Sequence, residues 1–155
     1  MRKLILLGTH GLALAIGFAL GIYFLPILTA PAGPDQAVLE AQAAGATYSA
    51  EFTRDLKGSD LFHWGEGTIS VSPERIVHMG DLAPGPDYKL YLVPEFVDDE
   101  ASFEAVKDQS VRIGDVKTFN GVILDVPADV DIDAYTTVVI WCEAFGEFIT
   151  AAKYR

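Results

Sequence analysis

Hydrophobic residues fill the start of the chain without interruption by charge. The stretch Leu4–Leu28 carries no charged side chain, contains only Thr9 and His10 as polar residues of note, and follows the basic pair Arg2 and Lys3. A bilayer core of about 30 Å requires about 20 apolar residues in a helix. Residues 1–28 are therefore predicted to form one transmembrane signal anchor, which holds the protein to a membrane through residues 4–28.

A cleavable signal peptide is the alternative interpretation of this stretch. Such peptides have an apolar region of about 7–15 residues followed by a small-x-small cleavage site. The apolar run here is longer, and the nearest site of that kind, Ala30-Pro31-Ala32, contains a proline. We therefore favour a retained anchor. Because the basic pair precedes the helix, the positive-inside rule predicts a single-pass protein of the cell membrane, with a cytoplasmic amino terminus and a periplasmic or extracellular domain.

Small residues recur on one face of the predicted anchor. Gly17 and Gly21, extended by Ala13, are spaced as in small-xxx-small faces, which allow two helices to approach closely. A homodimer through Gly17 and Gly21 is one interpretation. The other is the ordinary glycine and alanine content of membrane helices, which we favour because a single GxxxG is a common chance match.

Residues 29–47 are predicted to be a linker. They contain Pro31 and Pro34, and the alanine-rich stretch Ala37–Ala46 is compatible with a short helix. We expect this linker to lift the following domain off the lipid.

From Tyr48 onward the pattern changes to short β-rich runs bounded by Gly, Pro and Asp, which is typical of an all-β sandwich or barrel. Thr68–Ser72 alternates with period two and turns at Pro73-Glu74 into Arg75–Met79, which predicts a hairpin. Tyr88–Val93 is the next predicted strand. Glu100–Lys107 is predicted as a short helix or loop whose start is favoured by the preceding acidic residues.

A second hairpin is predicted around Asn120-Gly121, a dipeptide suited to a two-residue turn, with Val116–Phe119 and Val122–Val126 as its strands.

The run from Tyr135 to Cys142 has apolar residues on both faces, which predicts a central strand buried on both sides. Phe148–Ala152 is expected to pair beside it after a bend at Gly146. One face of the central strand would hold Val138, Ile140 and Cys142, and the other Tyr135, Val139 and Trp141. Residues 48–155 are therefore predicted to form one antiparallel, β-sandwich-like domain.

Charge excludes one large class of partner. The formal net charge is −11, and without Arg2 and Lys3 the rest of the chain carries 9 basic and 22 acidic residues, a charge of −13. Because nucleic-acid binding relies on clusters of Lys and Arg, we predict no nucleic-acid partner. The absence of a GxSxG motif argues against a hydrolase.

The single cysteine, Cys142, limits the possible cofactors. An internal disulfide and a thiolate-ligated iron–sulfur cluster both need more cysteines, and the chain has no CxxCH motif for covalent haem. A metal bound by Cys142 with His63 or His78 is a lesser hypothesis, because no histidine or methionine follows the cysteine as in blue-copper loops. His78 and its neighbour Met79 also point to opposite sheet faces. We expect each histidine in a loop or at a strand edge, and no cofactor is identifiable.

Alternating carboxylates at Asp129, Asp131 and Asp133 resemble the start of a calcium loop. The glycine and the distal glutamate of that motif are missing, so a solvated turn is the favoured interpretation.

Three segments together resemble the DM-thirteen domain, a small extracytoplasmic module often described as an electron-transfer domain. They are Gly85–Leu92 with its Gly-Pro-Asp start, Gly114–Pro127, and Tyr135–Phe145 with its tryptophan-cysteine pair. The resemblance covers about Tyr48 to Ala152, and Lys153-Tyr154-Arg155 replaces the family's usual apolar finish. It implies a β-sandwich-like fold in which the cysteine, here Cys142, serves as a redox centre.

The residues themselves leave the role of Cys142 open. A reactive thiol needs an electropositive, accessible setting, but Cys142 follows a buried strand, is next to Glu143, and has no cation near it in sequence before Lys153. A raised pKa and a structural role are therefore as consistent with the pattern as redox chemistry. Aromatic side chains near it, with the acidic residue of the Gly-Pro-Asp motif, are candidates for a binding pocket: Tyr135, Trp141, Phe145 and Asp87.

Two functions follow from the residues and the resemblance, an electron-transfer module and a binding module, and both are favoured over a turnover enzyme. The first is a redox accessory that uses Cys142 alone, with a partner thiol, or with a bound metal. The second is a non-catalytic binding module that recognises an envelope protein or a small ligand.

Overall fold

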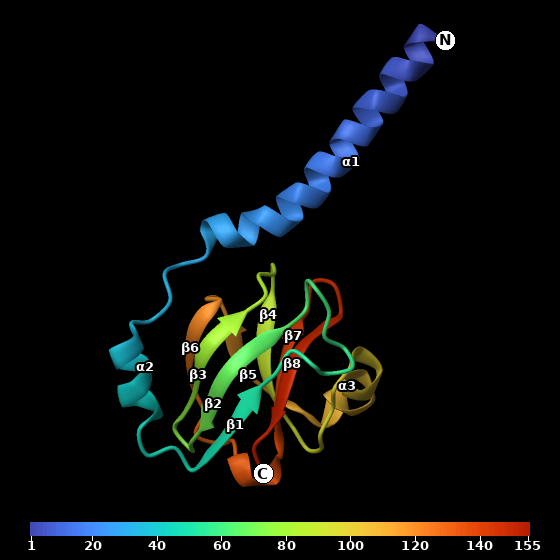
Figure 1. The fold of residues 1–155 in the computed structure, drawn as a ribbon. Coiled ribbons are helices and arrows are strands. Elements are labelled where there is room, and N and C mark those ends of the chain that lie inside the picture. Colours follow the sequence, from blue (N-terminus) through green and yellow to red (C-terminus); the bar gives the residue numbers. More distant parts are fainter.

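The amino-terminal helix projects from the rest of the chain in the computed structural model, which describes all 155 residues (Figure 1). Helix α1 spans Arg2–Thr29 and contains Pro26, and none of its residues is buried. Its most apolar window has a mean hydropathy of 2.2, and the helix is long and apolar enough to cross a membrane, a property that signal sequences share.

The remaining chain forms two antiparallel four-stranded sheets that pack face to face, which confirms the predicted β-sandwich-like fold. The first sheet has the order β1-β2-β3-β6 and the second the order β5-β4-β7-β8. The strands of the first sheet are β1 (Tyr48–Phe52), β2 (Gly65–Val71), β3 (Arg75–Leu82) and β6 (Asn120–Asp125). Those of the second are β4 (Tyr88–Val93), β5 (Val111–Val116), β7 (Thr137–Cys142) and β8 (Glu147–Lys153).

The first predicted hairpin is confirmed. Strands β2 and β3 pair with Val71 opposite Ile76, and the turn between them is closed by Ser72, whose hydroxyl donates to the Arg75 carbonyl at 2.9 Å. Strand β4 begins and ends where the sequence pattern predicted.

The second predicted hairpin, at Asn120-Gly121, is wrong. Strand β5 pairs with β4 in one sheet and β6 pairs with β3 in the other, so the chain crosses between the sheets at residues 117–119 instead of turning back. Gly121 does have a positive φ of 103°, but a Cβ atom there would lie 2.7 Å from Cδ1 of Leu39. The glycine therefore allows helix α2 (Gln36–Ala43) to approach the sheet, and Asn120-Gly121 does not form a turn between two paired strands.

The central strand is β7, which is buried along its whole length between β4 and β8, as predicted. Val138, Ile140 and Cys142 point into the core between the sheets. Val139 and Trp141 point outward and are covered by helix α3 (Glu100–Val106). The predicted face of Tyr135 is wrong, because this residue precedes the strand and packs against the core between the sheets.

Helix α3 confirms the helical alternative for the segment that begins at Glu100. Asp99 caps the helix, since its carboxylate accepts a hydrogen bond from the Ser102 N–H at 2.8 Å. In return, the Ser102 hydroxyl oxygen accepts a hydrogen bond from the backbone N–H of Asp99. The helix is followed by a single 3-10 turn, η1 (Lys107–Gln109), and a second such turn, η2 (Ile132–Ala134), precedes β7.

The carboxyl end of the chain closes the sandwich. Gly146, at a φ of 69°, makes the bend that was predicted before β8. Tyr154, in the stretch that departs from the family's apolar finish, is buried, and its hydroxyl donates to the Ile132 carbonyl at 2.7 Å. The Tyr154 ring is thus part of the core between the sheets.

Part of the segment predicted as a linker packs on the domain. Leu39 of α2 is buried where that helix lies along β3 and β6. Gly33 lies so close to Asn120 that a Cβ atom would be 2.4 Å from its side-chain oxygen. Only the six residues Ala30–Asp35 separate α1 from α2, and they run along the surface of the sandwich (Figure 1).

Candidate functional site

Cys142 lies at the end of the sandwich that faces α1. The residue is only 3% exposed, yet it lines a cavity of about 330 Å³ with mostly hydrophobic walls. The walls come from α1, the loop before β2, the turn before β4, and the start and end of the β7–β8 turn. The lining residues are Ala19, Ile22, Tyr23, Phe62, His63, Pro84, Gly85, Pro86, Tyr88, Cys142, Phe145, Glu147 and Ile149.

Two aromatic contacts shape this cavity. Tyr23 of α1 meets Phe62 edge to face, with the ring centroids 5.9 Å apart. Tyr88 stands directly opposite Cys142 in the pairing of β4 with β7. The turn before β4 lies on the Tyr88 ring, since a Cβ atom at Gly85 would be 2.3 Å from the hydroxyl oxygen. Glycine at position 85 is therefore required for the turn that forms one cavity wall.

Burial raises the pKa of the Cys142 thiol, because the thiolate would lose its hydration. The backbone N–H groups of Phe145, Asp87 and Ala144 near the sulfur oppose this effect, but they do not overcome it. Burial also raises the pKa of Tyr88, and the neighbouring Cys142 adds to that shift. Both groups are thus held in their protonated forms at neutral pH.

The two histidines have different surroundings. His63 lies in a loop, as expected, and lines the same cavity as Cys142. Its Nδ1 lies 3.1 Å from Oδ2 of Asp60, and its backbone N–H donates to the other carboxylate oxygen at 2.8 Å. His78 was expected in a loop or at a strand edge, and this is wrong. It lies inside β3, is 1% exposed, and faces the core between the sheets opposite Ile69.

No group of three or more histidine, cysteine or acidic side chains is arranged to bind a metal. Cys142 and His63 alone would supply two ligands, whereas zinc sites use at least three from the protein and blue-copper sites at least three.

The buried ring of His78 is held as a neutral tautomer. Its Nε2 lies 3.0 Å from the Glu66 carbonyl oxygen, so this nitrogen carries the proton, while Nδ1 has no hydrogen-bond partner. The ring also packs on Phe52 at 5.1 Å. Burial lowers the pKa of His78, although the Glu66 carbonyl and the carboxylates of Asp81 and Glu51 partly oppose this shift.

His78 is expected to make the stability of the domain depend on pH. The pKa is about 6.5 in the unfolded chain and lower in the folded chain, so below pH 6.5 the unfolded chain takes up a proton that the folded chain does not. The free energy of unfolding should therefore fall as the pH is lowered from 7 toward 5. Urea unfolding of wild type and His78→Leu at both pH values tests this. An equal loss in the two proteins would contradict it.

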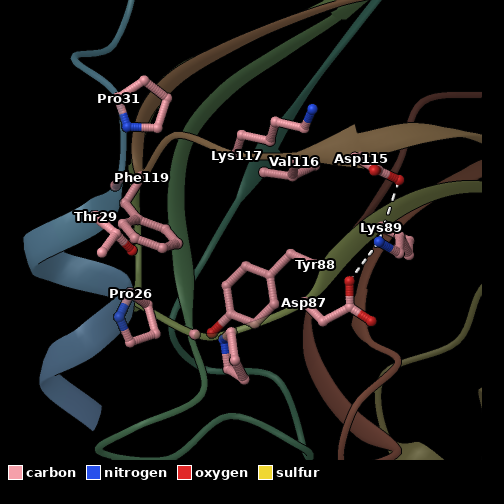
Figure 2. A pocket seen from close by; sticks show the side chains of 13 residues that line it. Pro26, Thr29, Pro31, Asp87, Tyr88, Lys89, Asp115, Val116, Lys117 and Phe119 are labelled. Carbon is pink, nitrogen blue, oxygen red and sulfur yellow. Dashed lines mark hydrogen bonds and ion pairs between the residues drawn. The ribbon is translucent and has the colours of Figure 1, made fainter. Parts of the chain in front are cut away.

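A second cavity, of about 290 Å³, lies on the other side of Tyr88, under the carboxyl end of α1. Figure 2 shows Lys89 between the carboxylates of Asp87 and Asp115, and the Asp115 oxygen lies 3.1 Å from its Nζ. The hydrogen bond that Nζ of Lys89 donates to the Asp87 carboxylate raises the pKa of Lys89. Pro26 and Thr29 of α1 complete the wall opposite these charges.

The sequence-predicted binding residues are only partly brought together. Phe145 shares the first cavity with Cys142, and Asp87 lines the second cavity beside it. Trp141 points to the other side of the sheet, under α3, and Tyr135 lies before the opposite end of β7. The sequence did not identify Phe62, Tyr88 and the α1 residues as part of the cavity wall. Nothing in their local sequence pattern shows that α1, the loop before β2 and the turn before β4 meet in the fold.

The charge of Glu143 is neutralised away from Cys142. Its carboxylate accepts hydrogen bonds from the Tyr91 hydroxyl and from Nζ of Lys107, the latter at 2.8 Å. Burial alone would raise the pKa of Glu143, but these two hydrogen bonds and the positive charges of Lys107 and Arg112 together outweigh it, and the pKa lies below its ordinary value. The sequence places no cation near Glu143, whereas the fold brings Lys107 to it from the end of α3.

A comparison with known protein families matches most of the β domain. A protein-family model described as "Electron transfer DM13" matches residues 52–154, which include strands β2 to β8 and Cys142. No curated protein and no solved structure matches the chain. The family match covers about two thirds of the sequence and includes all three segments whose motifs resemble the DM-thirteen domain. This chain belongs to the DM13 electron-transfer family.

Proposed function

We propose that this protein is a membrane-anchored electron-transfer module whose redox group is Cys142. The observation that carries the proposal is that the only thiol of the chain lines a cavity and is not enclosed on all sides by core side chains. The family description as an electron-transfer domain supports the reaction class. The apolar helix α1 and the basic pair before it support a single-pass anchor with the domain on the periplasmic or extracellular side.

Thiol–disulfide exchange is the reaction that one cysteine can perform. The Cys142 thiolate attacks one sulfur of a partner's disulfide, the partner's S–S bond breaks, and a mixed disulfide forms as the partner's second sulfur leaves as a thiolate. The proton of the Cys142 thiol passes to a base, for which His63 is the imidazole that lines the cavity. A dithiol of a second protein then resolves the mixed disulfide: its first thiolate displaces the Cys142 thiolate, and its second thiolate displaces the remaining thiolate of the reduced partner, so that a disulfide forms in the second protein. Two electrons thus pass from the second protein to the partner, and Cys142 takes up a proton and returns to the thiol.

A binding module without redox chemistry is the second candidate. The raised pKa of Cys142 favours it, because a protonated thiol is a poor nucleophile. The cavity of about 330 Å³ falls within the range of small-ligand pockets, about 300–1,000 Å³. In that case the cavity or the surrounding loops recognise a small ligand or an envelope protein.

Exchange of Cys142 with a small aromatic disulfide distinguishes the two functions. We expect the folded full-length chain in nanodiscs to form the mixed disulfide stoichiometrically, and the rate should rise about tenfold per pH unit below the thiol pKa. Mass spectrometry measures the product without ambiguity, since the chain has one cysteine. Cys142→Ser is the control that shows no product. Exchange that begins only after unfolding in urea would contradict the redox function and leave the binding module.

A helix dimer through Gly17 and Gly21 remains a prediction. Both glycines lie on the exposed surface of α1 with no atom of the chain near their Cβ positions.

A further inference from the structure

The end of the domain that faces α1 carries three large exposed apolar side chains. Leu61 is 80% exposed and Phe62 is 54% exposed in the loop before β2, and Phe145 is 54% exposed in the turn between β7 and β8. Phe62 and Phe145 line the same cavity, so the two loops meet at this end. We call Leu61, Phe62 and Phe145 the apolar tip. Such a surface on a domain (residues 48–155) that carries 20 acidic and 9 basic residues, a charge of −11, indicates a partner that is itself apolar.

The contact with α1 sets the height of the apolar tip relative to a membrane. The stretch Leu4–Tyr23 contains about 20 residues, which span about 30 Å in a helix and so match the hydrocarbon thickness of a bilayer. Tyr23 then lies at the outer interface, where tyrosine is enriched in membrane proteins. Because the Phe62 ring lies 5.9 Å from the Tyr23 ring, the apolar tip lies at the same level.

We propose that the apolar tip inserts into the interfacial region of the same bilayer that holds α1. The inference rests on the membrane anchoring proposed above. The packing of the chain between anchor and domain supports it, because Gly33 lies against Asn120 and Leu39 is buried against Gly121, so the domain is held close to the end of α1. The cavity that contains Cys142 then opens toward the lipid headgroups.

A second copy of the chain is the other apolar surface that would cover the tip. The bilayer is favoured because α1, the segment that enters it, already forms one wall of the cavity beside the tip, through Ala19, Ile22 and Tyr23. The apolar tip is therefore continuous with the surface that lipid covers.

Fluorescence quenching by brominated lipid tests this placement in the full-length chain. The variants are Phe62→Trp and Phe145→Trp, with Phe96→Trp as the matched control. Phe96 is 46% exposed and follows Val93, the end of β4 that lies far from Tyr88 and the cavity. Each variant is reconstituted in phosphatidylcholine vesicles with or without bromine near the headgroup end of the acyl chains, and the wild-type signal from Trp64 and Trp141 is subtracted.

We expect brominated lipid to reduce the added fluorescence of Phe62→Trp and Phe145→Trp at least twofold and to leave that of Phe96→Trp unchanged. Equal quenching of the tip variants and the control would overturn the proposal. Tip tryptophans that are shielded from an aqueous quencher but not quenched by brominated lipid would also overturn it, in favour of a second copy of the chain.

Vesicle flotation separates this inference from the proposed function. A chain that does not float with the vesicles contradicts the anchoring itself, whereas a chain that floats without quenching at the tip contradicts only the insertion. The disulfide exchange of Cys142 is measured independently of both.

Discussion

Trp141→Ala should lower the free energy of unfolding by about 3–5 kcal/mol, the usual cost of truncating a fully buried tryptophan. Trp141 is 1% exposed and packs on Phe103 of α3, with the ring centroids 4.9 Å apart. Nζ of Lys107 lies 5.2 Å from the centre of the same ring. Removing the indole therefore leaves a cavity under α3 and removes one of the two aromatic rings that Lys107 contacts, the other being Tyr91. Urea unfolding followed by circular dichroism measures the change.

Two further variants show whether the loss comes from packing. Trp141→Phe keeps most of the apolar volume and removes the indole N–H, which is buried without a hydrogen-bond partner, so it should cost clearly less than the alanine variant. Trp64→Ala is the matched control, because Trp64 is partly exposed and stacks on Arg54 at 3.3 Å. We expect a loss of about 1 kcal/mol there. Similar losses for Trp64→Ala and Trp141→Ala would contradict the central role of Trp141.

Gly67→Ala should destabilise the domain by about 3 kcal/mol or more. Gly67 has a φ of 107°, and a Cβ atom there would lie 2.3 Å from the Met79 carbonyl oxygen on the neighbouring strand. Alanine would therefore add backbone strain and a clash with backbone atoms that cannot rotate away. Because Gly67 pairs with Gly80, and the Glu66 carbonyl before it accepts the hydrogen bond of His78, the clash would also disturb the histidine.

Gly45→Ala separates the cost of backbone strain from the cost of the steric clash. Gly45 has a φ of 80°, so alanine is strained there too, but no atom lies within 4 Å of its Cβ position. We expect a loss of about 1 kcal/mol, and the difference between the two variants then measures the clash. Thermal or urea unfolding of both proteins provides the comparison. Equal losses would show that strain alone makes glycine necessary at position 67.

The elements that follow a simple period were predictable from the sequence. Strand β4, the β2–β3 hairpin and the buried strand β7 each have a local signal, in the spacing of apolar residues or in the turn that joins two strands. The prediction of a hairpin at Asn120-Gly121 was wrong because glycine meets two different structural requirements, a tight turn and the close approach of another side chain. A positive φ with no side chain suits a tight turn, but at Gly121 it suits the approach of Leu39 from a helix about 80 residues earlier in the sequence.

The site was less predictable than the fold, because it is assembled from segments far apart in the sequence. Cys142 was identified from its type and from the family motif, and its raised pKa was anticipated from the buried strand before it. The cavity beside it depends on Phe62 and Tyr23, whose contact joins a loop to the anchor helix. Likewise, only the fold brings Lys107 to Glu143. Contacts of this kind leave no periodic signal in a single sequence.

The short connection between α1 and α2 determines which molecules can meet the domain. Six residues, Ala30–Asp35, reach at most about 20 Å when fully extended, and here they are laid along the sandwich. In the proposed anchored state, a domain held this close to α1 diffuses in the plane of the membrane and stays at a fixed distance from its surface. Electron donors or acceptors in the same membrane would then reach Cys142 by lateral diffusion. The lipid would block the access of a large soluble protein to that end of the domain.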